Sequence, residues 1–138
     1  MAKTISYRLF GIGKIPQAQL AQLPNEEILL QDEGMRGSVT FINFHSPGRY
    51  ASWKRQWYTS AILLTRDRLM AWRHSTTIIN VPLMDERLRR MRFQKEDDGT
   101  LLIAFDAGLF QADWSGTIEY RFRTPQAQRL MDLLGQLM

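Results

Sequence analysis

Apolar and polar residues alternate in short segments between residues 27 and 123, and this pattern limits the fold more than any other feature of the chain. The clearest segment spans residues 117–123, where Ile118, Tyr120 and Phe122 alternate with polar residues. Successive side chains of a strand point to opposite faces of a sheet, so the segment is predicted to be a strand with one buried and one solvated face. Turn residues separate such segments at short intervals, which is typical of an antiparallel sheet or barrel.

Seven strands are predicted from this alternation. They cover residues 36–44, 53–64, 69–73, 77–81, 88–94, 101–105 and 117–123. Pro47 and Gly48 fit the central positions of a type II turn between the first two strands. Asp98-Gly99 is a strong hairpin signal, because both residues accept the positive φ that a tight hairpin turn requires.

The last segment changes to a helical period. Thr124 is a suitable N-cap and Pro125 suits the first helical position, where its missing N–H costs nothing. One helical face collects the apolar residues Ala127, Leu130, Met131, Leu134, Leu137 and Met138. A strand meander that ends in one amphipathic helix predicts a mainly β fold of the α+β class. We expect residues 1–26 to form an N-terminal arm and residues 27–138 to form one domain.

The length and composition of the chain limit the number of domains and the kinds of chemistry it can carry. The 138 residues suit a single domain with one hydrophobic core. The chain contains no cysteine, which excludes disulfides, thiolate metal sites and cysteine nucleophiles and favours a cytoplasmic location. The sequence shows no signal peptide and no apolar run of roughly 18 residues, so we expect no transmembrane segment.

The order of elements resembles the pleckstrin-homology-like superfamily, including its bacterial branch and the related GRAM domains. Two short stretches carry the local resemblance: residues 53–58, Trp-Lys-Arg-Gln-Trp-Tyr, and residues 64–72, Leu-Thr-Arg-Asp-Arg-Leu-Met-Ala-Trp. The closing Thr124-Pro125 and its apolar helix are a third. The resemblance covers about residues 27–138. It implies a seven-stranded antiparallel barrel capped by the C-terminal helix, and a protein that binds other molecules without a cofactor.

Basic residues concentrate in the middle of the chain. Residues 49–95 contain 11 Lys and Arg but three Asp and Glu, whereas the whole chain has a net charge of +4. Arg49, Lys54 and Arg55 follow the first predicted hairpin turn, with Arg36 nearby, and these four residues are the candidate site for an acidic lipid or a phosphorylated ligand. Neighbouring strand residues point to opposite faces, so at most one of Lys54 and Arg55 is expected to join Arg49. Ordinary solubilising charges are the alternative explanation.

The segment between the last two predicted strands, residues 106–116, is long for a hairpin loop. It contains three large apolar side chains, Leu109, Phe110 and Trp114. They are candidates for a partner-binding anchor. Equally, they are candidates for a satellite cluster packed under the sheet.

Catalytic patterns are weak. His45 and His74 stand alone beside predicted turns, and no metal-binding cluster can be assembled from them. The sequence around Gly11 and Gly13 does not match a phosphate-binding loop, because Arg8 and Ile15 replace required residues. Nucleic acid is an unlikely partner, since most aromatic residues fall on presumed core faces.

We therefore expect a non-catalytic binding or scaffold module that acts through protein–protein contacts or self-association. Binding of an anionic ligand or a membrane surface is the alternative function. Neither a metal nor a cofactor is expected.

Overall fold

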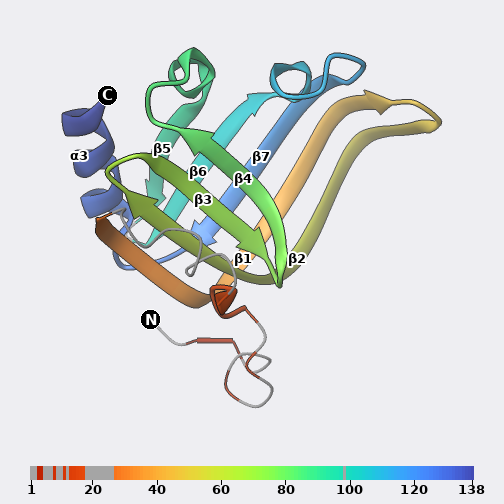
Figure 1. Ribbon diagram of the computed structural model, residues 1–138. Helices are drawn as coiled ribbons and strands as arrows, with labels where there is room; N and C mark the ends of the chain where they lie inside the picture. Colours follow the sequence, from red (N-terminus) through yellow and green to blue (C-terminus); the bar gives the residue numbers. More distant parts are fainter. Residues whose placement is uncertain (1–2, 5–7, 9–10, 12, 18–26, 98) are drawn as a thin grey trace.

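The computed structural model describes residues 3–4, 8, 11, 13–17, 27–97 and 99–138 (Figure 1). Seven strands form one antiparallel sheet in the order β4-β3-β2-β1-β7-β6-β5. The strands are β1 (Ile28–Ser46), β2 (Arg49–Thr65), β3 (Arg68–Arg73), β4 (Thr76–Pro82), β5 (Arg92–Asp97), β6 (Thr100–Asp106) and β7 (Ser115–Arg123). Helix α3 (Ala127–Leu137) follows, and two 3₁₀ turns, η1 (Glu86–Arg90) and η2 (Ala107–Leu109), lie between strands. The predicted mainly β class with one C-terminal helix is confirmed.

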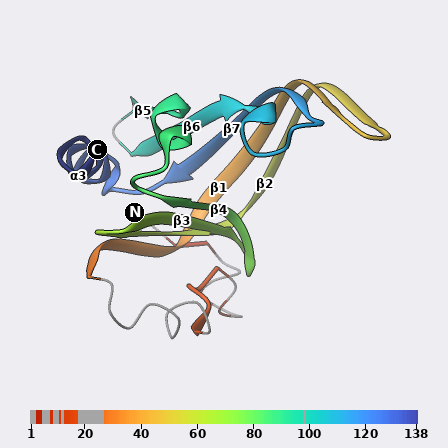
Figure 2. The ribbon, with the colours of Figure 1, turned by 45° about the horizontal axis from the view of Figure 1, so that its top comes forward.

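The two longest strands, β1 and β2, bend the sheet into two layers. Figure 2 shows β2, β3 and β4 in one layer, with β5, β6 and β7 facing them in the other. The main hydrophobic cluster fills the space between the layers. We call the side of the sheet that faces this cluster the inner face and the opposite side the outer face.

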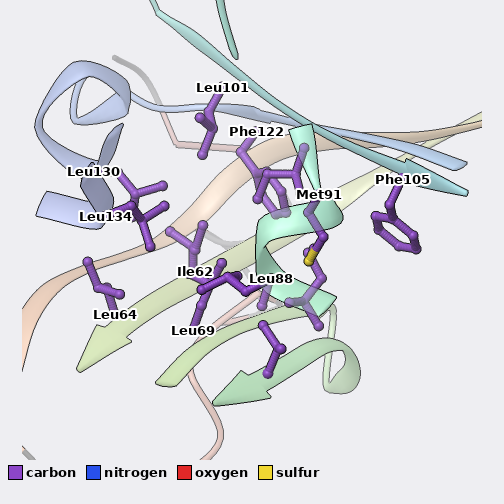
Figure 3. Packing of buried hydrophobic residues seen from close by; sticks show 14 of the residues in the cluster. Ile62, Leu64, Leu69, Leu88, Met91, Leu101, Phe105, Phe122, Leu130 and Leu134 are labelled. Atoms are coloured by element: carbon purple, nitrogen blue, oxygen red, sulfur yellow. The ribbon is translucent and has the colours of Figure 1, made fainter. Parts of the chain in front are cut away.

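The inner faces of both layers and helix α3 supply the core. Ile62, Leu64 and Leu69 come from one layer and Leu101 and Phe122 from the other, and each is at most 1% exposed. Leu130 and Leu134 of α3 point into the same cluster and cover one end of it (Figure 3). Burying side chains of this size contributes roughly 1.5–3 kcal/mol each to folding.

The sheet is not closed, so the predicted barrel is not observed. Within the described residues no bridge joins the edge strands β4 and β5. Turn η1 follows β4 in the chain, and its Leu88 is fully buried in the core (Figure 3).

The strand predicted at residues 88–94 starts later than expected, at Arg92. The Asp85 side chain accepts a hydrogen bond of 2.9 Å from the backbone N–H of Arg87 and caps a helical turn there. Because that turn directs Leu88 inward, residues 86–90 do not extend β5.

Helix α3 starts two residues later than predicted. The Thr124 hydroxyl accepts a hydrogen bond of 3.1 Å from the backbone N–H of Gln126, ahead of the first helical residue, Ala127. The same hydroxyl donates to the Asp32 carboxylate at 2.7 Å and so ties the helix to β1. In the part of the chain that the structure describes, no helix has the length and apolarity needed to cross a membrane.

The described residues of the N-terminal arm lie against the outer face of β2 and β3. The ammonium of Lys3 pairs with Asp32 at 2.5 Å, and the backbone N–H of Ile15 donates to the Glu33 carboxylate at 2.8 Å. Ile15 packs with four buried outer-face side chains: Ala61, Leu63, Met70 and Trp72. The middle of β2 and of β3 is therefore buried on both faces.

Candidate functional site

The hairpin of β1 and β2 extends away from α3, beyond the ends of the other strands (Figures 1 and 2). Gly48 has a φ of +75° in its turn, as the third position of a type II turn requires. Residues 34–66 include Arg36, Arg49, Lys54, Arg55 and Arg66 but no Asp or Glu. The hairpin is consequently a positively charged projection.

A pocket of about 390 Å³ lies on the inner face where this hairpin meets β7. Phe41 and Phe44 contact each other at 4.9 Å between ring centroids, and Phe44 meets Trp114 edge to face at 5.3 Å. Ile118 and Tyr120 of β7 also line the pocket. These side chains give it a mainly aromatic wall.

Two cations complete the lining of this pocket. Arg49 and Lys54 belong to it, and neither forms an ion pair with a carboxylate of the described residues. Both residues are exposed, so their charges are screened by water in the free protein. An anion with an apolar part would meet unpaired positive charge and an apolar wall together.

Arg36 and Arg55, the other two predicted anion ligands, lie on the outer face. Lys54 and Arg55 are neighbours in β2, so alternation directs them to opposite faces, as predicted. The Arg55 guanidinium donates to the Thr40 hydroxyl at 2.8 Å. It lies 5.3 Å from the Trp53 ring centroid and 5.7 Å from that of Trp57. The four predicted cations are thus divided between two surfaces.

The predicted partner-binding residues are partly buried against the core. Leu109, Phe110 and Trp114 all pack against the main hydrophobic cluster. Phe110 meets Phe105 edge to face at 5.4 Å, and the Arg87 guanidinium lies 4.7 Å from the Phe110 ring centroid. Among these three, Trp114 lines the pocket with Arg49 and Lys54. Part of each side chain therefore remains available to a partner.

Two tyrosines lie on the inner face: Tyr58 is buried in the main cluster, and the half-buried Tyr120 lines the pocket. Burial raises the pKa of Tyr58 above its ordinary value, and it raises the pKa of Tyr120 to about 12. The Tyr58 hydroxyl donates to the backbone carbonyl of Ser38 at 3.1 Å. At neutral pH both hydroxyls keep their protons, so Tyr120 offers a ligand in the pocket a hydrogen-bond donor.

The histidines lie apart. His45 is on the hairpin, where its ring contacts the tilted ring of Tyr50 at 4.5 Å between centroids, and His74 is in the turn between β3 and β4. The described residues contain no group of three His, Cys, Asp or Glu side chains placed to hold a metal ion.

Two features of the site were not predicted from the sequence. One is the contribution of Trp114 to the same pocket as Arg49, which depends on the pairing of β1 with β7 that ends at His45 and Ser115. The other is the exposed Trp53 and Trp57 pair, whose side chains share one face because they are four residues apart in a strand. The Trp-x-Arg-x-Trp spacing carried that signal.

A search against models of known protein families found no match for this chain, and a search of curated proteins found none either.

Proposed function

We propose that this chain is a binding module of pleckstrin-homology-like architecture that attaches to anionic phospholipid surfaces through the β1–β2 hairpin. The strand meander and the helix at one end of the core support this architecture, together with the sequence resemblance. We propose a cytoplasmic, non-catalytic protein.

One observation carries the proposal: Arg49 and Lys54 line an aromatic pocket, and this pocket lies on a projecting hairpin that contains no Asp or Glu. A phosphate accepts charge-assisted hydrogen bonds from both cations. The apolar wall then contacts the part of the lipid next to the headgroup. Anionic membranes attract basic residues by about 1 kcal/mol each near the surface, so the acid-free hairpin is oriented toward the bilayer.

The exposed aromatic side chain at the hairpin turn supports the same orientation. Tyr50 is 63% exposed and follows Arg49 directly. Tyrosine and tryptophan favour the membrane–water interface, where an apolar ring and a polar group are both accommodated. A hairpin that projects beyond the other strands brings this ring to the membrane ahead of the rest of the sheet.

Protein–protein interaction, the first expectation from the sequence, is the second candidate. Leu109 and Phe110 use much of their surface against the core, which leaves a smaller anchor than fully exposed side chains provide. A partner presenting an acidic group beside an aromatic one would occupy the same pocket as the lipid.

The test is co-sedimentation with phosphatidylcholine vesicles prepared with and without phosphatidylserine. We expect binding to the anionic vesicles that falls steeply with salt, because exposed charges are screened within roughly 10 Å at 0.1 M salt. Reversing Arg49 and Lys54 to Glu should weaken binding by more than about tenfold. The matched control reverses Arg89 and Arg90, two exposed arginines outside the hairpin.

Calorimetry with a soluble inositol phosphate separates the headgroup from the bilayer. Binding of the soluble compound together with anionic vesicles places the phosphate itself in the site. Equal sedimentation of the wild type and the Arg49 and Lys54 variant would overturn the proposal.

A further inference from the structure

The outer face of the β1–β2 hairpin carries a row of alternating indole and guanidinium groups. Trp53, Arg55 and Trp57 follow one another on β2, and Arg36 of β1 completes the row, with its Cζ 5.1 Å from the Trp57 ring centroid. We call these four residues the Arg–Trp row. At about 3.3 Å per strand residue, the part on β2 is roughly 13 Å long.

The indoles of the row are unusually accessible. Trp53 is 60% exposed and Trp57 58%, although large aromatic side chains are normally mostly buried. Nucleic acid was an unlikely partner from the sequence because most aromatic residues were expected on core faces. These two tryptophans do not meet that expectation.

The cations of the row have no acidic partner among the described residues. On the same face Arg121 pairs with Glu96 at 2.6 Å and with Glu119 at 3.0 Å, and Arg92 also pairs with Glu119. Arg36 and Arg55 have no such pair. The positive charges of Arg36 and Arg55, beside the exposed indoles, are therefore uncompensated, whereas those of Arg92 and Arg121 are neutralised by glutamates.

Beneath the row the sheet is polar and fully buried. Thr40 accepts hydrogen bonds from Arg55 and, at 3.5 Å, from Arg121. The neighbouring Ser38 hydroxyl is buried and has no hydrogen-bond partner in the described part of the chain. Ser38 is paired with Trp57 on one side and Arg121 on the other, so it lies between the row and the arginines of β7.

A groove of about 420 Å³ runs beside the row. Arg36, Arg55 and Trp57 line one side, and Arg121, Glu96 and Asp97 line the other. Carboxylates accept hydrogen bonds from the N–H groups of bases, and guanidinium groups bind phosphates. A groove with both kinds of group suits a ligand that carries phosphates and hydrogen-bonding bases.

We propose that the Arg–Trp row and its groove bind single-stranded nucleic acid. Bases stack on exposed indoles and on guanidinium planes whatever their sequence, and a chain of phosphates matches a linear row of unpaired cations. An acidic peptide would use the cations but not the indoles. A bilayer would reach the hairpin turn, whereas Trp57 lies on the broad part of the sheet, opposite Ser38 and one strand away from Arg121.

The test is fluorescence anisotropy with a labelled oligothymidine, compared with an abasic oligonucleotide of the same length and charge. We expect the oligothymidine to bind about tenfold more tightly, since stacking of one base on an aromatic side chain is worth that much. Replacing both Trp53 and Trp57 by Ala should remove this difference, and replacing both by Phe should restore part of it. Met84→Ala, which truncates a fully exposed apolar residue elsewhere, is the control and should change nothing.

Charge reversal at Arg36 should weaken both oligonucleotides and reduce the dependence on salt, while Arg89→Glu should not. The tryptophan variants change no charge and should keep their binding to anionic vesicles, because Arg49 and Lys54 are intact. A failure of nucleic-acid binding can thus be distinguished from a failure of vesicle binding. Equal binding of the abasic and thymidine strands, or displacement of the oligothymidine by polyglutamate at equal charge concentration, would overturn the proposal.

Discussion

Leu88 provides a direct test of whether turn η1, between β4 and β5, is part of the core. Its side chain is fully buried in the main cluster, yet it belongs to the short turn η1. Leu88→Ala removes three carbon atoms from a site lined by strands of both layers, which have little freedom to collapse. Leu-to-Ala changes at such sites cost 2.7–5 kcal/mol in a well-studied series, so we expect a loss of about 3 kcal/mol.

Urea unfolding followed by circular dichroism measures this loss, and the melting temperature should fall by about 10 °C for a chain of this size. Arg89→Ala is the matched control, because its side chain is exposed in the same turn. Its effect should stay within about 0.5 kcal/mol. A loss of less than about 1 kcal/mol for Leu88→Ala would show that η1 is not part of the core and that another element fills the gap between the edge strands.

Two further predictions concern the arm and Tyr120. Gly13 has a φ of +91°, and an added Cβ would lie 2.2 Å from the Thr59 Cγ2, so Gly13→Ala should lower the stability by at least about 2 kcal/mol. Thr59→Ser should recover part of that loss in thermal melts, and an unchanged melting temperature in Gly13→Ala would refute the contact. Tyr120 has a raised pKa in the folded protein, so its stabilisation is complete below pH 10 and declines as pH rises toward 12. Urea titrations across that range should show a shallower decline for Tyr120→Phe, and identical slopes would contradict the burial of the hydroxyl.

Alternation predicted the strands that have one buried face and one solvated face. Strand β7 shows this best, since Ile118 and Phe122 are buried while their neighbours are more exposed. The first predicted strand, residues 36–44, misses the start of β1 at Ile28, where Gly34 has a φ of +70° and the pairing shifts between Asp32 and Met35. A bulge inserts a residue and reverses the faces, so a period of two does not extend across it.

The covered outer face of β2 and β3 left a signal in the sequence. Residues 61–64 and 69–72 are continuous apolar runs, which are typical of strands buried on both faces. The apolar runs did not predict which segment of the chain covers this face. It depends on contacts such as Ile15 with Glu33, which join residues distant in the chain.

Arg49, Lys54 and Trp114 were candidate residues from the sequence and line the pocket, but the sequence did not predict that they would meet there. Alternation correctly separated Lys54 from Arg55. Which of them would lie beside Trp114 depended on the side of the hairpin that faces β7, and that follows from the bend of the whole sheet. The open gap between β4 and β5 was equally beyond local patterns, because it depends on the inward direction of Leu88.

The outer face of β2 changes its character along one strand, and Thr59 marks the boundary. Before it, Trp53, Arg55 and Trp57 are charged or aromatic, and after it the outer-face residues are the buried Ala61 and Leu63. The hydroxyls of Thr4 and Thr59 lie within hydrogen-bond distance at 2.8 Å, and Gly13 approaches Thr59 on the same side.

The described arm residues thus cover the apolar half of this face up to Thr59. Trp53 and Trp57 are each more than half exposed. Covering them would bury roughly 100 Å² or more of each side chain. Guanidinium groups interleaved with those indoles raise the cost of covering them with an apolar segment, because unpaired charges would lose water. Covering the row with an apolar segment would therefore cost more than covering the apolar half of the face, and this difference supports the proposal of a charged ligand.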